Sequence, residues 1–371
     1  MPIITSKNIE KLKKQKPELM IIENIKYIKH FQIHPEYWLE KDKLLSPVLK
    51  WVGGKGQILN PIFKHLPKTI NNYYEPFVGG GSVFLELIRQ IENQNIKLKK
   101  KIIVNDNNKD LIDLYKMIKE EPNTLIKELN TFKQYYDKAD MPVAKYKLDD
   151  NGEQTLDNKG NPIKIRVNTK NMGKTSINTA ISKGKDWIYY HFREYYNNYD
   201  IKINPKYRKS SILLFLNKTC FKGLYREGTI GFNVPFGNYT NPHIFNKNKI
   251  KLLSYYFNKY DIEFHNMDFE KFCKKIKGKT DFVYLDPPYY PLKSNSFITY
   301  NKTGFKEEHH QILLKICQQL NKKGTKLVHN NSYCDWNIDK YKEFKHDKLL
   351  CTRRINSKNP KDTDYELIMY N

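Results

Sequence analysis

The stretch Asp281-Phe-Val-Tyr-Leu-Asp-Pro-Pro-Tyr289 decides the fold of this chain. The apolar run after Asp281 predicts a buried strand, and Asp286 follows at its carboxyl end, where open α/β sheets bind their ligands. The two prolines remove backbone N–H donors and impose an extended turn, so nearby carbonyl groups stay free to accept hydrogen bonds. Acceptors beside an aromatic ring suit a planar base that carries an exocyclic amino group. The alternative is that the stretch only gives the strand a rigid exit.

Patterns on both sides of this stretch predict an α/β protein with a parallel sheet. Upstream, Tyr73–Ser82 is typical of a strand that ends in a glycine turn, and Val83–Ile88 of a helix. The next strand is expected at Lys101–Asp106, and a helix at Asp110–Glu121. Strand, turn, helix and strand in this order begin a βαβ unit. Further strands are expected at residues 282–285, 326–329 and 365–369.

The glycine turn Val78–Ser82 and the acid Asp106 predict a nucleoside site. The glycines lack the G-x-G-x-x-G spacing of dinucleotide-binding proteins, so nicotinamide binding is not favoured. Glycines at a helix entry let the backbone approach a bulky ligand, and an acid after the next strand can accept from ribose hydroxyls. Together they favour an adenosine-containing ligand without a pyrophosphate. The alternatives are a simple tight turn and, for Asp106, a surface acid or helix cap.

The composition indicates a polyanionic partner. The 371 residues include 65 Lys and Arg against 40 Asp and Glu, which gives a formal net charge of +25. Such a field attracts nucleic acid, although an AT-rich genome also enriches lysine without selection for binding. The cysteines form no C-x-x-C pair, so neither a disulfide scaffold nor a zinc ribbon is indicated, and no metal is expected. No apolar run approaches about 18–20 residues, so membrane spanning is not expected.

Two segments stand apart from the α/β pattern. Residues 1–45 are basic, with apolar positions three and four apart, and form an appended arm. Residues 143–186 carry turn signals around short alternating runs and predict a polar insertion with one or two hairpins. A glycine- and aromatic-rich loop follows at 221–237.

Four motifs occur in a specific order: Lys50-Trp-Val-Gly-Gly-Lys55, then Glu75-Pro-Phe-Val-Gly-Gly-Gly-Ser-Val-Phe-Leu85, then Asp106 after a strand, then Asp286-Pro-Pro-Tyr289. In this order they resemble the Dam family of DNA N6-adenine methyltransferases (D12 class, group alpha), of the GATC type. The resemblance implies a Rossmann-like, seven-stranded α/β sheet that binds S-adenosyl-L-methionine. It also implies an inserted helical and β-hairpin target-recognition domain. The domains would be 1–45, a basic extension; 46–142 and 255–371, catalytic; and 143–254, target recognition including the insertion at 143–186.

The resemblance also implies which residues of this sequence are functional, because they match functional positions of the family. The cofactor-binding positions are Trp51, Lys55, Phe77, Gly79, Asp106 and Asp286. The DNA-binding positions are Phe221, Lys222, Arg226, Pro235 and Tyr239, with Arg226 on the residue that reads guanine. Segments that also resemble family signatures are Tyr189–Asn197, Phe232–Gly237 and Arg353–Ser357.

The catalytic positions would be Asp286, Pro287, Pro288 and Tyr289. The target adenine must leave the duplex to be reached. We expect Asp286 and the Pro287 carbonyl to accept the two amino hydrogens of the flipped base, and Tyr289 to stack on it. The expected partner is double-stranded DNA, with a cognate restriction endonuclease as a further candidate and no protein partner needed for catalysis. The expected location is intracellular, wherever the target DNA is: bacterial cytoplasm, or a host cell or virion.

Departures from the family pattern leave alternatives open. The arm and the insertion lack clear counterparts in shorter members, and Lys222 stands where GATC enzymes often have Asn. The chain could instead methylate adenine in another site such as CATG or in RNA, or be a non-catalytic DNA-binding relative. His309 and His310 are expected on an exposed helix that runs to Leu320, and the run His329-Asn330-Asn331, after a strand, could border the site.

Overall fold

The computed structural model describes residues 44–142, 149, 153–157, 160–162, 169–201, 205–291, 304–352 and 363–371. The basic arm up to residue 43, much of the predicted insertion and the Arg353–Ser357 signature lie outside the described residues. Within the described part, no helix has both the length and the apolar character needed to cross a bilayer.

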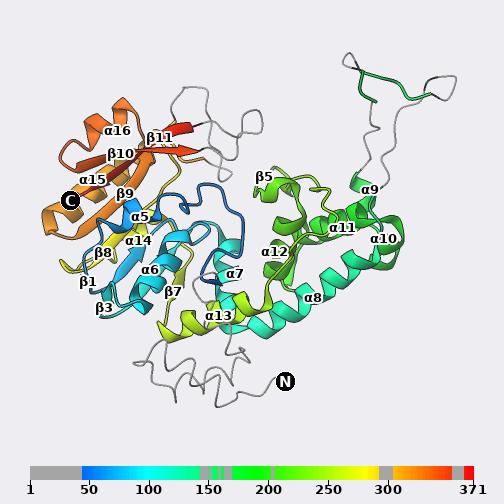
Figure 1. Ribbon diagram of the computed structural model, residues 1–371, viewed down its shortest axis with the longest axis horizontal. Coiled ribbons are helices and arrows are strands. Elements are labelled where there is room, and N and C mark those ends of the chain that lie inside the picture. Colours follow the sequence, from blue (N-terminus) through cyan, green and yellow to red (C-terminus); the bar gives the residue numbers. More distant parts are fainter. Residues whose placement is uncertain are drawn as a thin grey trace. The chain divides into compact units, whose positions relative to one another are not determined.

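A seven-stranded sheet forms the core of the first unit, in the order β10-β11-β9-β8-β2-β4-β7 (Figure 1). The run from β9 to β7 is parallel, and β11 is antiparallel to both β9 and β10. The strands are β2 (Tyr73–Glu75), β4 (Ile102–Asn105), β7 (Glu263–His265), β8 (Phe282–Leu285), β9 (Lys326–Ser332), β10 (Lys345–Thr352) and β11 (Thr363–Tyr370). The predicted mixed α/β fold with a mostly parallel central sheet is confirmed.

The strand order creates a switch point between β2 and β8. From β2 the chain builds outward through β4 to β7, then returns to lay β8 on the other side of β2. In open α/β sheets, ligands bind beyond the carboxyl ends of the strands at such a point. Glu75 ends β2, and Asp286 directly follows β8. The two most informative motifs of the sequence therefore meet at this edge.

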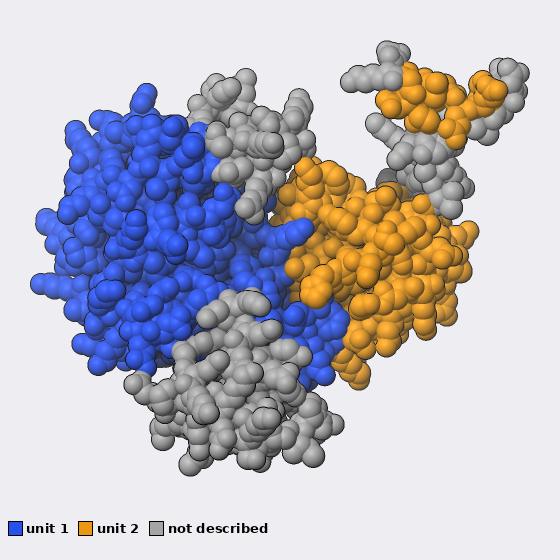
Figure 2. Space-filling view, in the orientation of Figure 1, with its two compact units in different colours: residues 1–126, 245–371 blue, residues 127–244 orange. Residues whose placement is uncertain are grey.

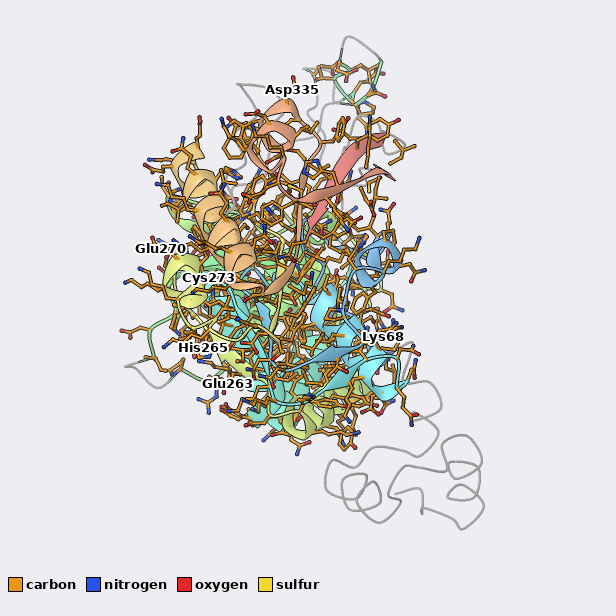
Figure 3. All side chains as sticks on the ribbon, turned by 90° about the vertical axis from the view of Figure 1, so that its left-hand side faces the viewer. Lys68, Glu263, His265, Glu270, Cys273 and Asp335 are labelled. Carbon is orange, nitrogen blue, oxygen red and sulfur yellow. The ribbon has the colours of Figure 1, made fainter. Side chains whose placement is uncertain are left out.

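Helices cover both faces of the sheet. On one face, buried residues of α14 (Phe269–Cys273) and α15 (Glu307–Lys323) pack with Val283 and Leu285 of β8. On the other face, Phe84 of α6 (Ser82–Glu92) contacts Tyr115 of α7 (Lys109–Glu120) and Phe257 of α13 (Lys247–Lys259). In Figure 3, the labelled residues Glu270 and Cys273 of α14 lie on the left of the ribbon, and Lys68 lies on the right. The remaining elements of this unit are α5 (Leu59–Phe63), β1 (Thr69–Ile70), β3 (Lys97–Leu98) and α16 (Asp335–Lys340).

The chain divides into two compact units, coloured separately in Figure 2. The first unit comprises residues 1–126 and 245–371, and the second comprises residues 127–244. The elements that lie wholly or mainly in the second unit are α8 (Pro122–Lys138), α9 (Thr169–Gly173), α10 (Ile177–Lys183), α11 (Lys185–Asn197), α12 (Lys209–Thr219), a 3-10 turn (Phe221–Gly223) and the hairpin strands β5 (Glu227–Gly228) and β6 (Gly231–Phe232). Assigning target recognition to residues 143–254 stays a prediction.

Candidate active site

Asp286, Lys55 and Tyr289 form a contact group at the carboxyl end of β8. The Lys55 ammonium lies 2.9 Å from Asp286 Oδ2, and both side chains are largely buried, at 6% and 18% exposure. Lys55 Nζ also donates to the Gly53 carbonyl at 2.7 Å and lies 4.9 Å from the centre of the Tyr289 ring. The other carboxylate oxygen, Asp286 Oδ1, is buried and has no hydrogen-bond partner among the described residues. One oxygen is thus held by a cation and the other remains an acceptor.

The electrostatic surroundings of Asp286 pull its pKa in two directions. Burial raises the pKa of Asp286 to about 6, Lys55 opposes that rise, and the Glu366 carboxylate adds to it. At neutral pH the ionised form still predominates, so the side chain acts as a hydrogen-bond acceptor. Glu75, at the end of neighbouring β2, accepts from the Tyr73 hydroxyl at 2.7 Å, and burial raises the pKa of Glu75 well above its ordinary value.

Residues of β9 and β11 fix the chain just after the prolines. The Tyr289 hydroxyl donates to Glu366 Oε2 at 2.8 Å. The backbone N–H of Tyr290 donates to Asn331 Oδ1 at 2.8 Å, and Ser332 Oγ donates to the Tyr290 carbonyl at 2.7 Å. The sequence reasoning missed Glu366 and Ser332, whereas Asn331 belongs to the run His329-Asn330-Asn331 that it named as able to border the site. The available signal for Glu366 was a charged residue among the apolar and aromatic residues of the strand expected at 365–369.

The glycine turn is tied to the end of β4. The Gly79 N–H donates to Asp106 Oδ2 at 3.0 Å, and the Asn108 N–H donates to Asp106 Oδ1 at 2.9 Å. Burial raises the pKa of Asp106, and these N–H groups act against that rise. A Cβ atom at Gly79 would lie 3.1 Å from Trp51 Cδ1, so the indole lies directly against the turn. Trp51, Gly79 and Asp106 are therefore brought together.

Gly81→Ala is expected to destabilise the first unit by about 1–3 kcal/mol, because overpacking and left-handed strain coincide there. Gly81 has φ +80°, and a Cβ would lie 2.4 Å from Phe84 Cε1 and 2.8 Å from the Tyr115 hydroxyl. Urea unfolding measures the change. Gly56→Ala is the control, since a Cβ at Gly56 would have no atom within 4 Å. Equal stability of the two variants would contradict the packing argument.

The remaining predicted cofactor residue, Phe77, lies in a partly buried aromatic group. Its ring centroid is 5.3 Å from that of Phe269 and 6.0 Å from that of Phe305. The role of Phe77 in binding a ligand stays a prediction.

The five predicted DNA-binding residues all lie in the second unit, on and beside the β5–β6 hairpin. Four of them have exposed side chains, and that of Tyr239 is partly buried. The Phe221 N–H donates to the Pro235 carbonyl at 2.8 Å, which joins the two ends of the segment. Arg226 Nε donates to Asn233 Oδ1 at 2.7 Å across the hairpin. Lys222 has φ +55°, an uncommon conformation for a residue other than glycine.

One face of α11 holds this hairpin in place. The Tyr189 hydroxyl donates to the Val234 carbonyl at 2.6 Å, and Arg193 Nη1 donates to the same carbonyl at 3.3 Å. Asn197 Nδ2 donates to the Phe232 carbonyl, and Asn197 Oδ1 accepts from the Phe232 N–H. Residues four apart share a helix face. The residues of the Tyr189–Asn197 signature therefore hold the hairpin segment through hydrogen bonds to its backbone.

The histidine predictions are partly wrong. His310 lies on α15, as expected for a helix there, but it is buried at 1% exposure rather than exposed. Its ring packs edge-on against Tyr290 and Phe305, which covers this side of the helix. Burial lowers the pKa of His310 to about 4 and that of His329 to about 3, so both are neutral at physiological pH. Among the described residues, no group of three His, Cys, Asp or Glu side chains could hold a metal ion.

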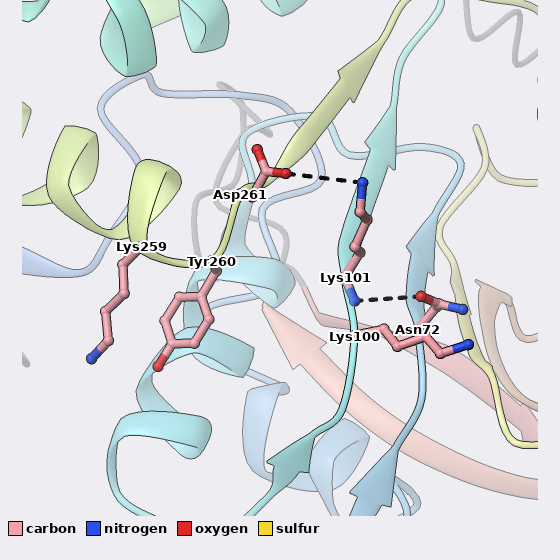
Figure 4. A pocket seen from close by; sticks show the side chains of 6 residues that line it. All are labelled: Asn72, Lys100, Lys101, Lys259, Tyr260 and Asp261. Carbon is pink, nitrogen blue, oxygen red and sulfur yellow. Dashed lines mark hydrogen bonds and ion pairs between the residues drawn. The ribbon is translucent and has the colours of Figure 1, made fainter.

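A pocket of about 530 Å³ lies at the opposite edge of the sheet (Figure 4). Asn72, Lys101 and Asp261 line it, and they directly precede β2 and β4 and approach the start of β7. Lys101 lies 3.9 Å from Asp261 and 2.6 Å from Glu263, so its charge is already paired. This is the amino edge of the parallel strands, away from the switch point. The predicted catalytic residues lie at the other, carboxyl edge, and their role stays a prediction.

Comparison with known proteins agrees with this geometry. Residues 51–355 match the family of D12 class N6 adenine-specific DNA methyltransferases. The chain is 34% identical to the type II methyltransferase M.MjaIII of Methanocaldococcus jannaschii, over 88% of this chain and 99% of that protein. It is 31% identical to the type II methyltransferase M1.LlaDCHI of Lactococcus lactis, over 86% and 93%. It is 27% identical to the DNA adenine methylase of Escherichia coli, over 73% and 75%.

The match spans both the motif-bearing strands and the hairpin segment of this chain. The resemblance to D12 class adenine methyltransferases is therefore confirmed at the level of the class. This chain is an adenine-specific DNA methyltransferase, and it belongs to the D12 class N6 adenine-specific family.

Proposed function

We propose that this enzyme transfers a methyl group from S-adenosyl-L-methionine to N6 of a flipped adenine, within GATC in double-stranded DNA. The observation that supports the proposal most strongly is the hydrogen bonding of the Asp286 carboxylate. Its Oδ2 is held by Lys55 at 2.9 Å, while its buried Oδ1 keeps its acceptor capacity. A buried acceptor without a partner is costly unless a ligand supplies the donor. An adenine amino group is such a donor.

The residues around the glycine turn fit the proposed cofactor. Gly79 and Gly80 pass so close to Trp51 that a Cβ at either would lie 3.0–3.1 Å from the indole side chain. Asp106 keeps spare lone pairs on its carboxylate, which suit ribose hydroxyls. Aromatic and carboxylate groups without a phosphate cradle suit an adenosine that lacks phosphates. The cofactor supplies an activated methyl group on a sulfonium.

Asp286 and the Pro287 carbonyl would accept the two N6 hydrogens. These bonds favour a tetrahedral nitrogen, whose lone pair then points away from the ring system. As the N6–methyl bond forms and the sulfur–methyl bond breaks, positive charge develops on N6, and the Asp286 carboxylate stabilises it. One amino hydrogen then passes as a proton to the Asp286 carboxylate, which releases it to water. Tyr289 would stack on the extruded base, which offsets part of the lost duplex stacking.

The β5–β6 hairpin is the proposed reader of the site. Arg226 would contact guanine O6 and N7 through its two Nη groups, while Asn233 Oδ1 fixes its Nε. Nη2 would leave its weak bond to the Asn233 carbonyl, at 3.5 Å, to do so. Phe221 is 43% exposed, an unusual state for a large aromatic side chain, and suits insertion between bases. Lys222, Pro235 and Tyr239 would contact the DNA nearby. The net charge of +25 would add salt-sensitive affinity for the phosphates.

The relatives support a role in site-specific modification. Two of them are named type II methyltransferases, and a partner endonuclease that cuts the same site is accordingly proposed for this chain. A third is named a DNA adenine methylase, and this name does not refer to a restriction type. Cleavage of unmethylated but not methylated DNA in extracts of the source cell would support the partner, and equal survival of both would contradict it.

The test of the proposed function uses labelled cofactor and three substrates. DNA duplexes that contain GATC or CATG, and an RNA that contains GAUC, are incubated with the purified chain. Label is expected in N6-methyladenine of the GATC duplex alone. Transfer only to CATG would overturn the site, and transfer only to RNA would overturn the DNA assignment.

Methyl transfer is expected to weaken at acid pH. The pKa of Asp286 lies at about 6, raised by burial, and the acceptor role requires the ionised form. Because the raised pKa places protonation closer to neutrality, kcat/KM should fall about tenfold per pH unit below about pH 6. A pH profile of kcat/KM measures this. A profile that stays flat down to about pH 4, the ordinary value for an aspartate, would contradict the assigned role.

A further inference from the structure

Glu366 lies on β11, the last strand, which β9 separates from β8 in the sheet. Its side chain nevertheless contacts Tyr289, just beyond the carboxyl end of β8. Register pairs Leu285 of β8 with His329 of β9, and Asn330 of β9 with Ile368 of β11. Side chains two apart on a strand share a face, so Glu366 lies on the same face as Ile368, Asn330 and the position of Asp286. The antiparallel strand β11 therefore places the Glu366 carboxylate at the edge of the sheet where the parallel strand β8 ends.

The contact with Tyr289 is direct. The Tyr289 hydroxyl donates to Glu366 Oε2 at 2.8 Å, a bond to a charged acceptor. Lys55 Nζ lies 4.9 Å from the same ring. A tyrosine ring turns about two side-chain torsions, and a bond at its far end to a residue on a paired strand restricts both. The ring plane is therefore set by β11 rather than by the proline turn alone.

We propose that Glu366 is a positioning residue for methyl transfer: it holds the Tyr289 ring in the plane on which the extruded adenine stacks, and it acts through the Tyr289 hydroxyl. This inference rests on the proposed function of the Asp286–Tyr289 corner. According to this inference, the orientation of the Tyr289 ring is set by Glu366, a residue far from Tyr289 in the sequence. A misplaced ring would leave the base free to turn away from Asp286, and rate would fall because orientation is lost.

Glu366 has a second, separable effect on Asp286. The described charged or titratable groups that interact with Asp286 are Lys55 before α5, Tyr73 and Glu75 on β2, Tyr284 on β8, Tyr289 after the prolines and Glu366 on β11. The Glu366 charge raises the pKa of Asp286. Removing that charge should therefore lower the pKa and move the acid limb of the pH profile to lower pH. A purely structural role would not move it in this direction.

The experiment is a double-mutant cycle on the full chain with a duplex substrate. Single-turnover methyl transfer is measured at about pH 8, where Asp286 is ionised in every variant. Glu366→Ala and Tyr289→Phe are each expected to slow transfer about 10- to 100-fold, the range for a hydrogen bond to a charged group. The double variant should be no slower than Tyr289→Phe alone, because the two changes break the same bond.

Glu366→Gln keeps the size of the side chain and an acceptor oxygen, so it tests the charge if the alanine variant does not fold. Its acid limb should lie at lower pH than that of the wild type. Glu263→Gln is the matched control: it removes a strand carboxylate at the opposite side of the sheet, on β7, and should leave the rate unchanged.

Two results would overturn the inference. One is equal slowing by Glu366→Ala in the wild-type and Tyr289→Phe backgrounds, and the other is an unchanged rate and pH profile in both Glu366 variants. A wild-type chain that transfers no methyl group to DNA would instead refute the proposed function itself. The two failures are therefore distinguishable.

Discussion

Asp286→Ala is expected to slow single-turnover methyl transfer by at least about 10²–10³-fold, the cost of removing one preorganised electrostatic group. DNA affinity should stay nearly unchanged, because the predicted DNA contacts lie in the second unit. The loss follows from the position of the carboxylate, which is held by Lys55 at one oxygen and buried without a partner at the other. Rapid-quench assays with labelled cofactor and a gel-shift assay separate rate from binding.

Two further variants sharpen this test. Asp286→Asn keeps the shape and one acceptor oxygen but removes the charge, so it should retain only a small part of the rate. Asp339→Ala, on α16, removes an exposed carboxylate and should behave as wild type. Appreciable turnover by Asp286→Ala would show that another group binds the amino hydrogens.

Arg226→Ala is expected to relax the choice of base at the guanine position by about 1–3 kcal/mol, or about 5- to 150-fold. The side chain is exposed, and its Nε is fixed to Asn233 at 2.7 Å, so the guanidinium plane is set before DNA binds. The ratio of kcat/KM for GATC and for a duplex with that guanine replaced measures the change. The rate on the altered duplex should change little.

Arg226→Lys is the matched control for charge. Lysine keeps the positive charge but lacks the planar pair of donors that contacts O6 and N7 together. It should restore overall DNA affinity without restoring the preference for guanine. If Arg226→Ala kept the full site preference, a different residue would read that base.

The central sheet could be predicted because its sequence signals are local. The apolar run before Asp286, the glycine turn before α6 and the acid after β4 each specify a strand end within a few residues. Parallel strands place such ends at one edge, so the meeting of Asp286 with the glycine-turn region follows from strand order. The class of enzyme could be predicted because the four motifs, in their order along the chain, resemble those of a known family, and the family match confirms the class.

Other parts of the site could not be predicted, because their contacts join distant strands. The bond between Tyr289 and Glu366 depends on the register of β11 against β9, and a single sequence does not reveal register. The anchors of Tyr290 on Asn331 and Ser332 have the same origin. The burial of His310 depends on the rings of Tyr290 and Phe305, which pack edge-on against it.

The recognition site is a separate matter from the reaction. The GATC preference, the DNA contacts and the cofactor contacts stay proposals, since the class match extends to enzymes named only as type II methyltransferases. We propose that Lys222 influences this preference, because it lies exposed beside Phe221 with its ammonium 5.7 Å from the centre of that ring.

The most direct test is a crystal structure of the chain with a duplex and sinefungin, an unreactive analogue of the cofactor. We expect the target adenine outside the helix, its N6 within hydrogen-bond distance of Asp286 Oδ1, its ring on Tyr289, and the analogue beside Trp51 and Asp106. An analogue bound at the amino edge of the sheet, near Asn72 and Lys101, or an adenine left in the duplex with the analogue far from Asp286, would contradict the account.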